Sequence, residues 1–133
     1  MKYKSELLCY VNFTASILFG YLIWTISPYY GCHEPWCNNI YFIELLTWGL
    51  LWGILGKGNL LISLLLSYVG CTLGQVIYLI IHVWPINTGS TSGAITIGIT
   101  FVFTPIISTF VIFGGIIGRL LIPLTKFLKN RTK

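Results

Sequence analysis

The densest group of chemically reactive side chains in this sequence lies in residues 32–37. The segment reads Cys-His-Glu-Pro-Trp-Cys and so holds two thiols, an imidazole and a carboxylate. A disulfide between Cys32 and Cys37 would suit a loop on an oxidising face of a membrane and is our first interpretation. A metal site, a catalytic thiol pair and free cysteines stay open as alternatives. Six adjacent residues rarely wrap a tetrahedral ion, and redox-active dithiols are typically spaced Cys-x-x-Cys, so we predict no metal and no cofactor.

A second pattern is a ladder of small hydroxyl side chains in the last apolar run, residues 95–122. Its members recur at every fourth position and are Thr96, Thr100, Thr104 and Ser108. On a helix with 3.6 residues per turn this spacing forms one slowly winding polar stripe. Because lipid tails offer no hydrogen bonds, the stripe has to face protein or a water-filled path. The ladder therefore predicts either helix packing or a polar path.

Three further polar side chains, Glu44, Gln75 and His82, interrupt apolar runs. If their two runs form antiparallel helices, Glu44 and His82 lie near the same membrane face and could pair in a pH-sensitive contact or a cation site. The simpler interpretation places both in the headgroup zone without contact. Gln75 lies near the middle of its run and predicts a hydrogen bond to another helix.

The composition explains why helices in a membrane must position these groups. Of 133 residues, 56% are hydrophobic and only 8% are charged, which leaves too few polar groups to cover a soluble domain. We predict an all-α integral membrane protein with a single transmembrane domain over residues 1–133. The four expected spans cover about 7–27, 40–56, 60–84 and 95–122. The expected outer loops cover 28–39 and 85–94, and a basic tail covers 123–133. The first run is long and lacks a small-residue cleavage site, so we interpret it as an uncleaved span.

The distribution of positive charge predicts the orientation. With four spans, all eight Lys and Arg residues fall on one side of the membrane. The positive-inside rule then places both termini in the cytoplasm and the protein in a cell (plasma or inner) membrane. The net charge of +5 does not indicate nucleic acid, because the basic residues lie at the ends of apolar runs. Lys57 and Arg119 lie on the cytoplasmic side as candidates for contact with a lipid phosphate or another anion.

Glycines at four-residue spacing, Gly49 with Gly53 and Gly70 with Gly74, predict close contacts between helices. Residues 53–57 also align with residues 115–119, since in both segments a Gly-Ile-x-Gly pattern ends at a basic residue. This match suggests two parallel repeats of two helices each.

Signatures of catalysis do not stand out in this chain. We find no glycine-rich phosphate loop, nucleophile elbow or zinc helix, and the chain contains no aspartate and three glutamates. We therefore favour a non-enzymatic membrane component, either a small transporter or channel-like protein or a subunit of a transport assembly. The alternatives are a structural or assembly subunit without its own path and an outward-facing thiol-redox protein. The expected partners are the lipid bilayer and either further copies of the chain or other membrane subunits, with no nucleic acid.

Overall fold

The computed structural model describes residues 2–26, 39–56, 59–84 and 91–131. These residues form α1 (Lys2–Ile26), α2 (Asn39–Leu55), α3 (Leu60–Tyr78), a short π-helix η3 (Leu79–Val83) that continues α3, and α5 (Thr91–Arg131). The part of the chain that is described is thus helical, as the composition predicts.

Three of these helices are long and apolar enough to cross a membrane. The stretches are Glu6–Thr25, Leu60–His82 and Gly98–Pro123, whereas the apolar part of α2, Tyr41–Leu55, is shorter. At 1.5 Å per residue, the 17 residues of α2 are about 25 Å long, somewhat less than the ~30 Å apolar core of a bilayer. The chain is therefore a membrane-embedded helical protein in its three long helices, and the crossing by α2 remains a prediction.

The last helix is longer than the apolar run that predicts it. It begins at Thr91, before residue 95, and continues to Arg131 through both Pro105 and Pro123. A proline removes one backbone hydrogen bond and strains its own turn, but the turns on either side keep their bonds. Part of the predicted outer loop and most of the predicted tail are therefore helical.

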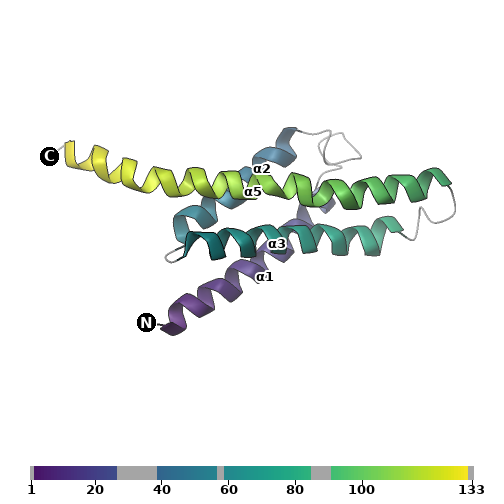
Figure 1. The fold of residues 1–133 in the computed structure, drawn as a ribbon, viewed down its shortest axis with the longest axis horizontal. Coiled ribbons are helices and arrows are strands. Elements are labelled where there is room, and N and C mark those ends of the chain that lie inside the picture. The colour runs from purple at the N-terminus through teal and green to yellow at the C-terminus, as the bar shows by residue number, and fades with distance from the viewer. Residues whose placement is uncertain (1, 27–38, 57–58, 85–90, 132–133) are drawn as a thin grey trace.

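The helices form two crossed pairs, α1 with α3 and α2 with α5 (Figure 1). The starts of α1 and α3 and the ends of α2 and α5 lie at the same end of the bundle (Figure 1). The two helices of each pair therefore run in the same direction.

Backbone meets backbone where α1 crosses α3. A Cβ atom on Gly20 would lie less than 3.0 Å from the carbonyl oxygen of Cys71, and one on Gly74 equally close to that of Ile17. The two contacts are reciprocal, because Ile17 and Gly20 have the same spacing on α1 as Cys71 and Gly74 have on α3. Any side chain at either glycine would push the two helices apart.

The crossing of α2 and α5 repeats this arrangement. A Cβ atom on Gly49 would collide with the carbonyl of Val111, and one on Gly114 with that of Leu46. The same relation holds further along both helices, for Gly53 with Gly115 and for Gly118 with Leu50. The reciprocal contacts thus make Gly49 equivalent to Gly114, and Gly53 equivalent to Gly118.

The alignment suggested by the sequence differs from this equivalence. The alignment matches Gly53 with Gly115, and these two residues touch each other. The reciprocal contacts instead make Gly53 equivalent to Gly118, three residues further along α5. The contacts therefore reflect how two glycine faces pack together, and the duplication of the two halves stays a prediction.

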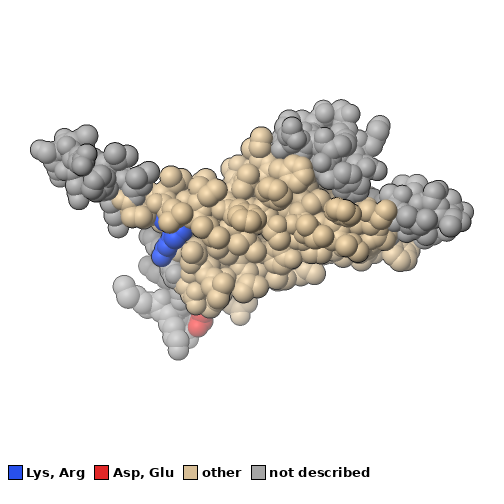
Figure 2. All heavy atoms as spheres, turned by 45° about the horizontal axis from the view of Figure 1, so that its top comes forward, with Lys and Arg blue, Asp and Glu red and all other residues tan. Residues whose placement is uncertain are grey.

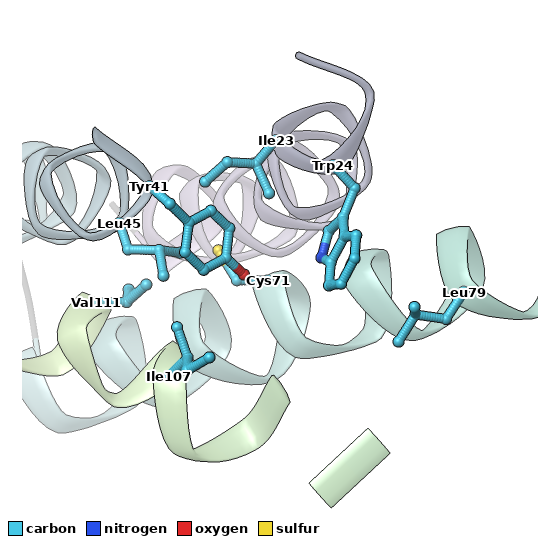
Figure 3. Packing of buried hydrophobic residues seen from close by; sticks show 8 residues of the cluster. All are labelled: Ile23, Trp24, Tyr41, Leu45, Cys71, Leu79, Ile107 and Val111. Atoms are coloured by element: carbon cyan, nitrogen blue, oxygen red, sulfur yellow. The ribbon is translucent and has the colours of Figure 1, made fainter. Parts of the chain in front are cut away.

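The interior combines an apolar core with polar side chains, and the outside is apolar. Figure 3 shows the core cluster, in which Tyr41 and Leu45 from α2 lie near Cys71 from α3 and Val111 from α5. Large apolar side chains such as Leu61, Val102 and Leu120 are more than 60% exposed. This distribution suits a protein whose surrounding solvent is lipid.

Candidate functional site

The chemistry of the described chain is concentrated in its interior. Seven polar side chains are buried: Asn12, Ser16, Ser67, Gln75, Thr100, Thr104 and Ser108. On α3 the residues Ser63, Ser67, Cys71 and Gln75 recur at every fourth position and so share one face. Sequence reasoning missed Ser63 and Ser67, although the same four-residue spacing that marks the ladder on α5 was available to find them.

Asn12 on α1 is the centre of a first polar cluster. Its Nδ2 donates to the backbone oxygen of Ser63 at 2.9 Å and to the Ser63 hydroxyl at 3.2 Å. Its Oδ1 accepts from the hydroxyls of Ser67 at 2.8 Å and Ser16 at 3.2 Å. Trp48 on α2 then donates its indole N–H to the Ser16 hydroxyl at 2.9 Å. The cluster therefore joins α1, α3 and α2, and both ends of the Asn12 amide are occupied.

Gln75 on α3 is the centre of a second polar cluster and is fully buried. Its Oε1 accepts a short hydrogen bond from the Tyr41 hydroxyl and a longer one, 3.5 Å, from the indole N–H of Trp24. Its Nε2 donates to the hydroxyl of Ser108 at 3.0 Å. Gln75, for which the sequence predicts a bond to another helix, thus binds side chains from α1, α2 and α5.

The hydroxyl ladder of α5 faces the interior of the protein at its described positions. Thr104 donates to the backbone oxygen of Thr100 at 2.8 Å, and Ser108 donates to that of Thr104 at 2.9 Å. Bonds of this kind satisfy a hydroxyl within its own helix. The side chain of Thr96 lies outside the described residues. The ladder is therefore tied to backbone carbonyls and, through Ser108, to Gln75.

His82 lies in η3, which continues α3, and is exposed. Its Nε2 is 2.7 Å from the hydroxyl of Tyr21 on α1, and its ring packs 4.7 Å from that of Tyr78 between centroids. Glu44 is half-buried on α2. The pairing of Glu44 with His82 stays a prediction.

Arg119 lies at the opposite end, where its Nη1 donates to the backbone oxygen of Gly56 at 3.1 Å. Lys57, the other candidate for contact with an anion, lies outside the described residues. Trp52 on α2 has a buried donor without an acceptor, because its indole N–H has no hydrogen-bond partner among the described residues.

The cysteine segment of residues 32–37 also lies outside the described residues, and its four interpretations stay open. In the described chain, Cys9 and Cys71 are free thiols. No group of three or more His, Cys, Asp and Glu side chains that could hold a metal ion occurs within residues 2–26, 39–56, 59–84 and 91–131.

Comparison of the chain with protein-family models, with curated proteins and with solved structures finds no match.

Proposed function

We propose that this protein is a non-enzymatic membrane protein that works as a subunit of a larger membrane assembly. The observation that carries the proposal is the use of its buried polar groups. The side chains of Asn12 and Gln75 are bonded to other helices at both their donor and their acceptor ends. Polar groups bonded in this way hold the helices together, and their hydrogen-bonding capacity is already used by the protein rather than by a solute.

The energetics favour this use of the polar interior. A solute that replaced one of these bonds would first have to break it, and leaving a buried donor or acceptor unsatisfied costs about 1 to 3 kcal/mol. The close crossings at Gly49 and Gly74 leave no room for a solute between the paired helices. A chain built in this way is suited to act through its exposed apolar faces, against further copies of itself or other membrane subunits.

A small transporter or channel-like protein is the second candidate. It is favoured by the polar face of α3, which extends from Ser63 to Gln75, about 18 Å of helix at 1.5 Å per residue. The half-buried carboxylate of Glu44 adds an ionisable group on α2. A path would then form between the two crossed pairs or between copies of the chain.

The thiol-redox alternative depends on Cys32 and Cys37 alone.

We further propose that the protein lies in a cell (plasma or inner) membrane with both termini in the cytoplasm. The support is the arrangement of the helices, because the starts of α1 and α3 and the ends of α2 and α5 share one end of the bundle. In the sequence, all eight basic residues lie within or directly next to these helix ends.

The deciding experiment is the native mass of the full chain after gentle solubilisation with its lipids and partners attached. The subunit proposal predicts a defined particle several times the 15.0 kDa of one chain. A lone chain in mild detergent would contradict it. Flux in liposomes that is lost in Glu44→Gln but kept in the exposed-hydroxyl control Thr47→Val would instead establish the transport function.

A further inference from the structure

Arg119 is a positive charge placed inside the apolar stretch of α5. The membrane-spanning part of this helix extends from Gly98 to Pro123, and residues 120–122 that follow Arg119 are all apolar. Four residues correspond to about 6 Å of helix, so the α-carbon of Arg119 lies roughly one turn inside the end of that stretch. A charged side chain at such a depth is costly unless it reaches the interface or binds a partner.

The protein positions this guanidinium but does not neutralise it. Its Nη1 donates to the backbone oxygen of Gly56, directly after the last turn of α2, where unpaired carbonyls carry a partial negative charge. No ion pair joins Arg119 to a carboxylate in the described part of the chain. A guanidinium has five N–H donors, and the Gly56 bond uses one of them.

The glycine crossing next to Arg119 makes the arrangement rigid. Gly118 packs against the backbone of Leu50, and Gly53 against that of Gly115, so the ends of α2 and α5 cannot separate without losing these contacts. The Gly56 carbonyl and the Arg119 side chain are thereby held together. The Arg119 side chain is half-buried, and among the described residues its printed hydrogen bond is the one to Gly56, so further N–H groups of the guanidinium can take another acceptor.

We propose that Arg119 binds the phosphate group of an anionic phospholipid in the leaflet next to the chain termini. A phosphate diester offers two oxygens that match the planar fork of a guanidinium, and binding would neutralise the charge without a protein carboxylate. The long arginine stem allows the charged group to reach the headgroup level. On the face shown in Figure 2, both the basic and the acidic side chains that are visible lie toward this same end, and the rest of the described surface on that face is uncharged.

A net negative lipid is favoured over a zwitterionic one by the composition, because the chain carries 8 Lys and Arg residues against 3 Glu residues. The sequence places Lys57 directly after Gly56 and three more basic residues, Lys126, Lys129 and Arg131, on the continuation of α5. Basic residues near an anionic membrane surface attract lipids of net negative charge from a distance, without forming the fork that Arg119 offers to one phosphate.

The test compares lipid binding by purified full-length variants. Arg119→Gln removes the charge but keeps an amide donor for the Gly56 oxygen, and Lys129→Gln removes the same charge from the tail. Native mass spectrometry of each protein with added phosphatidylglycerol or phosphatidylcholine gives the affinity for each lipid. We expect Arg119→Gln to lose phosphatidylglycerol affinity about tenfold or more, and Lys129→Gln to stay within about threefold of the unchanged protein.

Three results would overturn the proposal. They are wild-type phosphatidylglycerol binding by Arg119→Gln, an equal loss in Arg119→Gln and Lys129→Gln, and displacement of the lipid by millimolar inorganic phosphate. The last result would assign the site to a free phosphate. If Arg119→Gln does not fold, Arg119→Lys keeps the charge without the fork. We expect Arg119→Lys to bind phosphatidylglycerol more weakly than the unchanged protein. Unchanged binding would show that the two-oxygen contact of a guanidinium is not used.

Discussion

The side-chain amide nitrogen of Gln75 donates a 3.0 Å hydrogen bond to the hydroxyl of Ser108 in the fully buried centre of the bundle. This bond joins the two crossed pairs, because Gln75 belongs to the pair of α1 and α3 and Ser108 to the pair of α2 and α5. Within each pair the backbones are in contact, whereas these two polar side chains connect the pairs.

Gln75→Leu should therefore destabilise the protein by about 1 to 3 kcal/mol, because Tyr41 and Ser108 lose their buried partner. The measurement is unfolding in mixed detergent micelles. Thr47→Val is the matched control, because Thr47 is exposed and bonds only to the backbone oxygen of Ile43. Equal stabilities of the two variants would show that the Gln75 bonds do not hold the pairs together.

The glycine contacts predict opposite effects at two positions. Gly49→Ala should destabilise the protein by about 1 to 3 kcal/mol, because its methyl group would collide with the backbone of Val111. Gly98→Ala should stabilise it by about 0.5 to 1 kcal/mol, since nothing lies within 4 Å of the added atom and alanine favours a helix. Thermal unfolding of both variants in the same detergent measures the difference, and a reversed order would reject the crossing of α2 and α5.

Two tryptophans one turn apart on α2 provide a similar comparison. Trp48→Phe removes the bond to Ser16, so we expect a loss of about 1 kcal/mol. Trp52→Phe removes an indole N–H that is buried without an acceptor among the described residues, so it should cost less. Unfolding free energies of the two variants measure this order. A larger loss for Trp52→Phe would mean that its N–H has a partner, such as a buried water molecule.

The state of Cys32 and Cys37 can be read from a thiol count. The chain has four cysteines, of which Cys9 and Cys71 are free. If Cys32 and Cys37 form a disulfide, alkylation of the denatured, unreduced protein should label two thiols, and reduction should raise the number to four. Intact-protein mass spectrometry gives the count. Four labels without reduction would exclude the disulfide and favour the metal, catalytic or free-thiol alternatives.

The prediction of helices succeeded because it depends on a local requirement. An apolar run in lipid must satisfy its backbone hydrogen bonds within itself, and a helix does so. The expected span 40–56 accordingly differs by one residue at each end from α2. The end of α5 was harder to predict, because Pro123 and the basic residues after it resemble a helix end in sequence, although a helix tolerates the loss of one hydrogen bond.

By itself the sequence determined that the chain is an apolar, helical membrane protein and that α5 carries a polar stripe. It also determined that the glycines of the chain allow close contacts between helices. Only the tertiary structure decided that α1 crosses α3, that α2 crosses α5, and that Asn12 and Gln75 become the centres of the polar clusters. The physical reason is that periodicity reveals which side chains share a face of one helix. The partner of that face depends on the crossing and register of helices that are distant in sequence. Several glycine-rich faces could pack equally closely, so the pattern of one helix does not select its partner.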